Sequence, residues 1–363
     1  METKVDKQQG RRLILQNEPF YNYLRAINPK KEWGLKANKI FVSPSLFKSK
    51  DTPLDVLYNL LSPPDYTSAA LLEGSAFHLL VSEKTEDLIL HEKYGANLAC
   101  FTTLEEFNEF LETETEKEWF KNNILLINEK DLPDYPNIEF RKKGNREYRD
   151  RMLQRGKMEG KIVVFNVGEK NKNQLFRLYK MRKAVLLDIH YNTTDENDNI
   201  IKSYPLHKIL KKGEMETSFY YYDEEMDVYI KFRPDWYSKI LALIIDFKTV
   251  STADYYSFYY DSVKYGYDQQ AAFYIDYIKK IFGIDMKFAF ILVEKTAPFK
   301  TEFLVCDEEY IDGGRIKYKR RMRLLKEAFS TKIFRGYSVN HPTNEGYRML
   351  NKVSYADKED RNW

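Results

Sequence analysis

The stretch KFRPDWYSKILALIIDFKTV, Lys231 to Val250, contains an apolar run that ends in charged residues. Six aliphatic residues, Ile240 to Ile245, predict that Lys239 to Val250 forms a strand at the centre of a sheet, buried on both faces. Asp246 and Lys248 follow the run directly, and because they are two positions apart they point to the same face of that strand. Charge is costly at the end of a buried strand, so this segment is where a functional site is expected.

A second carboxylate, Asp235, lies eleven positions before Asp246, which leaves room for a strand, a tight turn and a return strand. Converging carboxylates repel each other unless a hard divalent cation binds between them. We therefore expect Asp235, Asp246 and the backbone carbonyl of Phe247 to bind metal, with Lys248 near the same reacting phosphate or water. The alternative is an ordinary surface ion pair between Asp246 and Lys248, which is common in proteins. The apolar run before the pair argues against that alternative.

The bulk composition is that of a globular protein. With 363 residues, 43% of them hydrophobic, the chain can bury a sizeable core in one large or two small domains. Its first residues lack an apolar signal region and its longest aliphatic run is far shorter than a bilayer span, so we expect a soluble, cytoplasmic protein without a membrane partner. Cys100 and Cys306 are too few and too distant for a disulfide framework, a structural zinc site or a four-cysteine cluster. A net charge of +3 leaves a polyanionic partner open.

Helical and strand patterns along the chain predict a mixed sheet flanked by helices. Helical patterns cover residues 46–61, 69–84, 105–121, 253–282 with a break near Gly266, and 312–333. Strand patterns cover 286–295, 300–306 and two segments of 217–237 around the turn DEEMD, and residues 160–189 predict a strand, a turn and an amphipathic helix. We expect an N-terminal arm at 1–42, a main domain at 43–335 with a variable insertion at about 84–202, and a C-terminal tail at 336–363.

Several short segments carry further candidate residues around the pattern formed by Pro234-Asp235 and Asp246-Phe247-Lys248. Upstream, GSAFHLLVSE contains His78 and GEMETSFYYYDEE contains Glu216, and downstream YDQQAAFYIDY contains Gln270 and Tyr274. In this order the segments resemble the PD-(D/E)xK nuclease superfamily, in particular RecE-type (exonuclease VIII) and lambda-exonuclease-like recombination nucleases. The match runs from about residue 43 to about residue 334 and is poor from roughly 83 to 202. Asp246 stands where Glu is more frequent in the family pattern.

The resemblance implies an α/β fold of the restriction-endonuclease type, with a three-layer α/β/α core, a mixed central sheet and extra helices. It implies a metal-dependent deoxyribonuclease of the exodeoxyribonuclease VIII type, which resects linear duplex DNA from 5′ to 3′ for single-strand-annealing recombination and repair. His78, Asp235, Asp246 and the Phe247 carbonyl would bind the metal, and Glu216 would assist directly or through water. Mg²⁺ suits an oxygen-rich site, and the histidine makes Mn²⁺ an equally good candidate activator.

The same resemblance implies partners. Related exonucleases often form homo-oligomeric rings that enclose DNA and act beside a single-strand annealing protein, so we expect both here, in a bacterial or phage-infected cell.

Each of the motif residues has a purely structural alternative. His78 lies in an apolar helical segment, where a buried, hydrogen-bonded histidine is common. Glu214 and Glu224 compete with Glu216 as the acidic residue. Gln270 and Tyr274 are one helical turn apart, so they can face one groove and hold a phosphate or orient Lys248. Tyr274 can equally be a core aromatic among 28 tyrosines, and Gln269 is the rival of Gln270 without the four-residue spacing.

Candidate DNA contacts come from two places. Arg233 adjoins the expected metal site, and a basic cluster between Lys317 and Lys326 includes Arg320 and Arg321. Apolar residues at 318, 322, 325 and 329 give that helix a core stripe and predict that its basic residues face outward, where they contact either DNA or only water.

Two other functions remain open at this point. One is a single-strand or structure-selective nuclease of the same fold; nucleases of CRISPR adaptation share these motifs but commonly carry a four-cysteine cluster, which two cysteines cannot form. The other is a catalytically silent DNA-binding or assembly protein, although such a protein has no need of both Asp246 and Lys248.

Overall fold

The computed structural model describes residues 4–6, 11–15, 41–46, 52–56, 69–83, 122–140, 142–168, 173–194, 200–226 and 228–331. The predicted helix at 105–121, most of the one at 46–61, much of the arm at 1–42 and the tail at 336–363 lie outside these residues. The predicted domain boundaries therefore stay a prediction.

Among the described residues, the central sheet has the strand order β14-β13-β12-β11-β8. Its strands are β8 (Glu214–Met215), β11 (Trp236–Ser238), β12 (Leu243–Val250), β13 (Lys287–Glu294) and β14 (Thr301–Val305). β12 runs parallel to β13, whereas β11 and β12, and β13 and β14, are antiparallel, so the sheet is mixed as predicted. The antiparallel pairing of Trp236 with Ile245 is the predicted return strand.

The β11–β12 connection differs from the prediction at its first residues. The strand begins at Leu243 rather than at Lys239, and Ile240 is 83% exposed. Residues 239–242 form the turn, in which Ala242 has a positive φ of 48°. Two adjacent antiparallel strands need a tight turn between them, and here the first residues of the aliphatic run form that turn instead of the strand.

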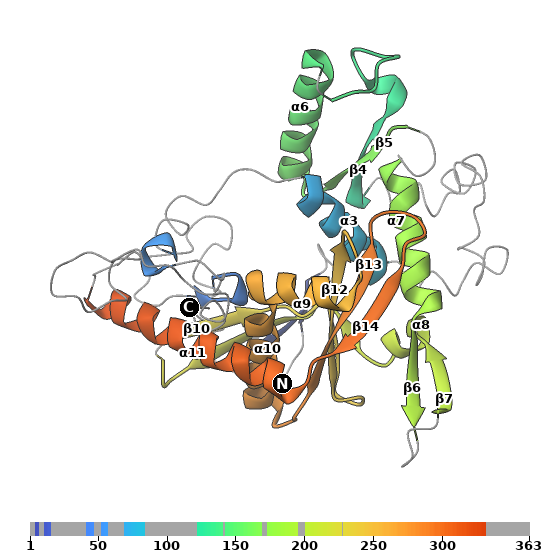
Figure 1. Ribbon diagram of the computed structural model, residues 1–363. Coiled ribbons are helices and arrows are strands. Elements are labelled where there is room, and N and C mark those ends of the chain that lie inside the picture. The colour runs from blue at the N-terminus through green and yellow to red at the C-terminus, as the bar shows by residue number, and fades with distance from the viewer. Residues whose placement is uncertain are drawn as a thin grey trace, which may run out of the picture.

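Helices cover both faces of this sheet (Figure 1). One face packs against α9 (Tyr255–Lys264), α10 (Tyr267–Phe282) and α11 (Glu308–Thr331). The other packs against α3 (Ala69–Glu83), α7 (Gln174–Lys183) and the π-helical turn η5 (Ala184–Asp188). Alternate strand residues serve the two faces: Ile244 and Phe290 join the first cluster, and Ile245, Phe247 and Ile291 join the second. This is the predicted three-layer α/β/α core.

Two helices on the first face have ends that the sequence pattern explains in part. The predicted break near Gly266 is present, with φ 72° at this residue between α9 and α10. α11 begins four residues before the predicted Asp312, because the Asp307 carboxylate accepts a hydrogen bond from the Tyr310 N–H at 2.8 Å and caps the helix there.

A second sheet lies beside the first and has the order β1-β2-β9-β10-β3 among the described residues. Its strands are β1 (Lys4–Asp6), β2 (Arg11–Leu15), β3 (Phe41–Val42), β9 (Ser218–Asp223) and β10 (Val228–Phe232). β9 and β10 form the predicted antiparallel pair around the DEEMD turn. Phe219 and Phe232 stack with their ring centroids 4.9 Å apart and join the core beneath α10, which attaches this sheet to the first face.

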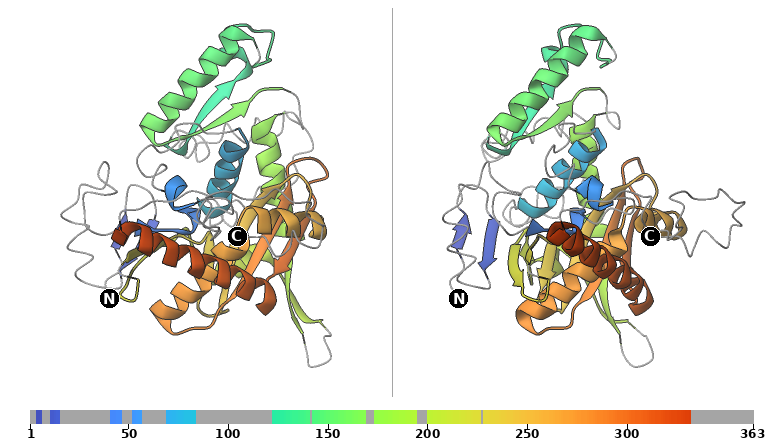
Figure 2. Two further views of the ribbon diagram at one scale, coloured as in Figure 1. Left: turned by 60° about the vertical axis from the view of Figure 1, so that its left-hand side comes forward. Right: turned by 90° about the vertical axis from the view of Figure 1, so that its left-hand side faces the viewer.

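A small lobe projects from the rest of the molecule (Figures 1 and 2). It contains β4 (Ile124–Asn128), β5 (Ile162–Asn166) and α6 (Lys143–Glu159), with its own apolar cluster around Ile127 and Val163. The remaining elements are η1 (Pro44–Leu46), η3 (Glu129–Asp131), β6 (His190–Thr194), β7 (Ile200–Pro205) and α8 (Leu206–Leu210). In the part of the chain that is described, no helix has the length and apolar composition needed to cross a membrane.

Candidate active site

The motif residues converge at one place although they come from five elements. His78 is on α3, Glu216 follows β8, Asp235 precedes β11, Asp246 and Lys248 are on β12, and Gln270 and Tyr274 are on α10. The strand order places β8, β11 and β12 side by side, and the two helices approach from opposite faces of the sheet. The fold thus brings together residues that are up to almost 200 positions apart in the sequence.

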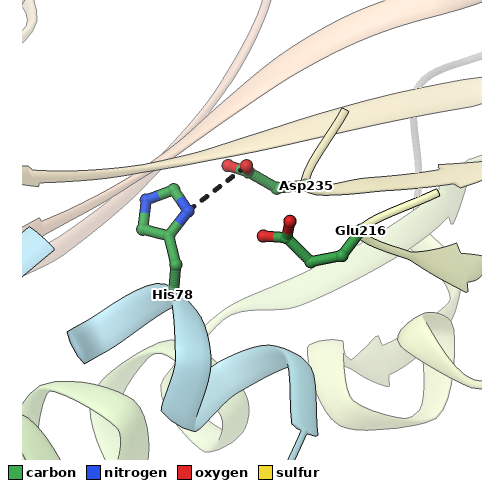
Figure 3. A group of neighbouring side chains, drawn as sticks. All are labelled: His78, Glu216 and Asp235. Carbon is green, nitrogen blue, oxygen red and sulfur yellow. Dashed lines mark ion pairs between the residues drawn. The ribbon is translucent and has the colours of Figure 1, made fainter. Parts of the chain in front are cut away.

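Three of these residues offer ligand atoms within 4.8 Å of one another: His78, Glu216 and Asp235. Figure 3 shows the imidazole of His78 and the two carboxylates pointing toward a common space. His78 Nδ1 lies 3.2 Å from Asp235 Oδ1, and the other Asp235 oxygen accepts a hydrogen bond from the Phe247 N–H at 2.7 Å. Asp235 therefore connects the His78 helix to the strand that carries Asp246.

The backbone explains why Glu216, rather than its rivals, reaches this space. Glu216 has a φ of 49°, a left-handed conformation that costs energy for a residue with a side chain. Its N–H donates to the carbonyl of Asp235 at 2.9 Å, which fixes the turn beside the metal candidates. Glu224 is exposed in the β9–β10 turn, and Glu214 lies 3.4 Å from the hydroxyl of Thr217.

Asp246 and Lys248 form an ion pair that is buried, unlike the surface pair of the alternative interpretation. The side chain of Asp246 is 3% exposed and that of Lys248 18%. Burial raises the pKa of Asp246, and the attraction of Lys248 opposes that shift without cancelling it. Burial alone would lower the pKa of Lys248, but the charges of Asp246 and Asp235 outweigh it and raise the pKa. The Lys248 ammonium also lies 4.5 Å from the ring centroid of Tyr267.

Gln270 and Tyr274 complete the surroundings of Asp246. The Gln270 amide donates to Asp246 Oδ1 at 2.8 Å, and the hydroxyl of Tyr274 donates to the carbonyl of Arg233 at 3.1 Å. Tyr274 is both a core aromatic and a member of the site, since its ring is buried and its hydroxyl lies 3.4 Å from the Gln270 amide. The rival Gln269 is buried in the α10 layer instead.

The charge state of the histidine follows from its neighbour. Burial lowers the pKa of His78, but the Asp235 carboxylate more than compensates and raises it to about 9. The same pairing holds the pKa of Asp235 below its usual range despite burial. Without a bound cation, His78 and Asp235 are therefore an imidazolium–carboxylate pair at neutral pH, and a metal ion has to displace that proton.

This donor set fits a divalent metal ion. One imidazole nitrogen and two carboxylates within 4.8 Å suit Mg²⁺ or Mn²⁺, and Asp246 adds a buried carboxylate on the neighbouring strand. Glu216, expected to assist directly or through water, belongs to the clustered triad. The metal contacts of Asp246 and of the Phe247 carbonyl stay predictions.

The candidate DNA contacts divide into two groups. Arg233 pairs with Glu216 at 2.7 Å, so it adjoins the site as predicted. In the basic cluster on α11, Arg320 is exposed, but Arg321 is 9% exposed and Lys317 pairs with the buried Asp268 at 2.9 Å. The expectation that all basic residues of this helix face outward is therefore wrong, because α11 packs along α10 and turns two of them inward.

A groove of about 600 Å³ opens beside the site. It is lined by Gln270 and Tyr274 and by residues that the sequence did not single out, among them Lys231, Tyr265 and Tyr267. The tyrosines carry no distinguishing signal in a chain with 28 of them, whereas Lys231 lies in the same PD-containing segment as Arg233.

The sequence from residue 62 to residue 338 matches the model of a family described as a "PDDEXK-like domain of unknown function (DUF3799)". The chain belongs to this family. This confirms the predicted superfamily and, with the observed layers, its α/β fold. Among solved structures, a protein from Eubacterium rectale called "Putative exonuclease" is similar over 92% of this chain and 98% of its own, with 12% identity and a TM-score of 0.45. No curated protein matches the chain significantly.

Proposed function

We propose that this protein is a metal-dependent deoxyribonuclease that hydrolyses phosphodiester bonds. The observation that carries the proposal is the convergence of a buried Asp246–Lys248 pair with the His78, Glu216 and Asp235 triad at one end of the central sheet. Buried carboxylates and a buried lysine are costly to keep, and a site that binds metal and phosphate uses all of them. Membership of a PDDEXK-like family supports the same class of chemistry.

The residues divide the work of hydrolysis among them. The bound metal ion would lower the pKa of the attacking water and stabilise negative charge on the phosphate. His78, Asp235 and Asp246 would hold it, with Glu216 as a further ligand or a base for the water. Lys248 would orient the attacking water or neutralise the charge that develops on the phosphate oxygens. Gln270 would keep the Asp246 carboxylate in place, since it donates to Oδ1.

The finer proposal follows the resemblance to RecE-type nucleases. We infer an exonuclease that resects linear duplex DNA from 5′ to 3′ with Mg²⁺ or Mn²⁺, in recombination and repair in the cytoplasm of a bacterial or phage-infected cell. A homo-oligomeric ring and a single-strand annealing protein as partner belong to this proposal.

Digestion of end-labelled DNA tests both the general proposal of a nuclease and the finer proposal of a 5′-to-3′ exonuclease. Linear duplex DNA, labelled separately at the 5′ and the 3′ ends, is incubated with Mg²⁺, with Mn²⁺ or with chelator. The finer proposal expects metal-dependent release that begins at the 5′ label and is lost in Asp246→Ala. The control variant Asp285→Ala should keep this release, because Asp285 is an exposed carboxylate before β13, away from Lys248. Cleavage of circular or single-stranded DNA instead keeps the nuclease and changes its substrate. Absence of cleavage with every metal favours a DNA-binding protein.

A further inference from the structure

The surface of α9 exposes an unusual group of aromatic side chains. Tyr255, Tyr256, Tyr259 and Tyr260, which we call the α9 tyrosine face, are 55%, 71%, 44% and 70% exposed. Their spacing of i, i+1, i+4 and i+5 places them on one side of the helix. Exposed apolar groups that gather in one place mark interaction sites, whereas single ones are ordinary.

The packing of α9 does not require these rings. Within the described structure, its buried residues are Phe258 and Ser262, four positions apart, which attach the helix to the core. Phe258 contacts Phe290 at 5.2 Å and Tyr267 at 6.2 Å between ring centroids. The tyrosine face lies on another side of the helix, so replacing its rings changes the surface and not the fold.

The helix that carries the α9 tyrosine face adjoins the candidate active site, because the ring of Phe258 on α9 lies 6.2 Å from the ring of Tyr267. Tyr267 is the ring beneath the Lys248 ammonium, and Tyr265, 53% exposed, lies 5.9 Å from it. Both tyrosines line the groove that also contains Lys231 and Arg233. The C-terminal end of α9 therefore borders the groove at Tyr265, and the cations Lys231 and Arg233 lie inside the groove.

We propose that the α9 tyrosine face stacks the bases of an unpaired strand at the end of a linear duplex, and that the backbone of this strand enters the groove. This inference rests on the proposed function and names the form of the substrate. Cations in the groove match phosphates, and rings outside it match bases, because each base has a π face that stacks on an aromatic ring without regard to sequence. A duplex buries those faces between its own base pairs, so only an unpaired strand offers them.

Other occupants fit the same surface less well. A membrane surface would need basic residues on the face for its anionic headgroups, and the face has none. The tyrosine hydroxyls keep the face wet, whereas interfacial membrane helices carry basic residues beside Trp, Phe and Leu. A second copy of this chain is the remaining rival, and the experiment includes it.

Fluorescence anisotropy with a labelled single-stranded oligonucleotide, in chelator so that no cleavage occurs, tests the proposal. Tyr256→Ala/Tyr260→Ala should bind about tenfold or more weakly than wild type, and Tyr256→Phe/Tyr260→Phe should bind like wild type because the rings remain. Tyr135→Ala, which removes an exposed tyrosine from the projecting lobe, is the matched control and should have no effect. A strand with abasic sites should weaken wild type toward the double alanine variant and leave that variant unchanged.

Equal binding of the oligonucleotide by wild type and the double alanine variant overturns the inference. So does a variant that changes only self-association, measured by sedimentation, because the face would then contact a second copy. Failure of the proposed function is seen separately, as wild-type protein that binds the strand but cleaves no DNA with any metal.

Discussion

The Lys248 ammonium is buried between an acid and an aromatic ring, so its removal changes charge more than packing. We expect Lys248→Ala to abolish cleavage, since the charge that develops on the phosphate loses its cation. Folding and metal binding should remain nearly intact. Single-turnover cleavage and metal titration measure the two effects, with Lys300→Ala as a control at an exposed lysine. Retained turnover would remove Lys248 from the chemistry.

The pairing of His78 with Asp235 predicts a pH dependence of stability in the metal-free protein. The pKa of His78 is about 9 in the folded chain and about 6.5 in an unfolded one. Because the folded pKa is the higher one, the stabilisation is complete below pH ~6.5 and is lost as the pH rises through about 9. Denaturant unfolding in chelator should therefore show a free energy of unfolding that falls over this range.

A matched pair of variants assigns that slope. His78→Gln should flatten it, and His190→Gln, at an exposed histidine, should leave it as in wild type. A slope unchanged in His78→Gln contradicts the assignment. The same proton opposes metal binding, so metal affinity should rise with pH until His78 is deprotonated, with proton release measurable by calorimetry in buffers of different ionisation enthalpy.

At the scale of elements, the crossing of α10 and α11 positions Gln270. A Cβ added at Gly314 would lie 2.1 Å from the carbonyl oxygen of Asp268, so the two helix backbones touch there. We expect Gly314→Ala to destabilise the protein by about 1–3 kcal/mol through overpacking. It should also lower cleavage. The clash falls at Asp268, two residues before Gln270, so the start of α10 has to move and the Gln270 side chain moves with it.

The adjacent Gly313 is the control for this crossing. A Cβ there meets no atom within 4 Å, so Gly313→Ala should be neutral or stabilise α11 by about 0.5–1 kcal/mol. Chemical denaturation of both variants measures the difference. Equal stability of the two would mean that the helices separate at this crossing without cost.

The sequence predicts the elements whose pattern is local. The run before Asp246 identifies β12, and the spacing of Asp235 identifies its antiparallel neighbour, because strand alternation and tight turns depend on adjacent residues. The features that the sequence does not predict are those that depend on packing against residues far along the chain. Arg321 lies in a basic cluster and is nevertheless buried, and the inward position of Lys317 requires Asp268 on another helix. Membership of Glu216 in the triad depends on a left-handed backbone that no residue pattern marks.

At the scale of the whole molecule, the projecting lobe carries a local positive charge that the net charge of the chain does not reveal. Residues 142–161, which include α6, contain eight basic and three acidic residues, although the entire chain has a net charge of only +3. The lobe packs on the α3 layer, which carries His78, through β5 (Figure 1). A duplex that extends away from the site can therefore meet a basic helix whose Lys142, Arg146 and Arg151 are exposed.

We expect this helix to bind the phosphate backbone of duplex DNA. Replacing Lys142, Arg146 and Arg151 together by Ala should weaken binding of a long duplex and reduce the slope of log K against log salt by about one unit for each phosphate that the variant no longer neutralises. The control variant replaces three exposed lysines, at 211, 239 and 287, near the end of the central sheet that lies away from Lys248. This variant should change the slope little. A duplex too short to reach the lobe should bind wild type and the α6 variant equally. If shortening the duplex leaves the difference between these two proteins unchanged, the lobe acts through the general field of the protein rather than by direct binding.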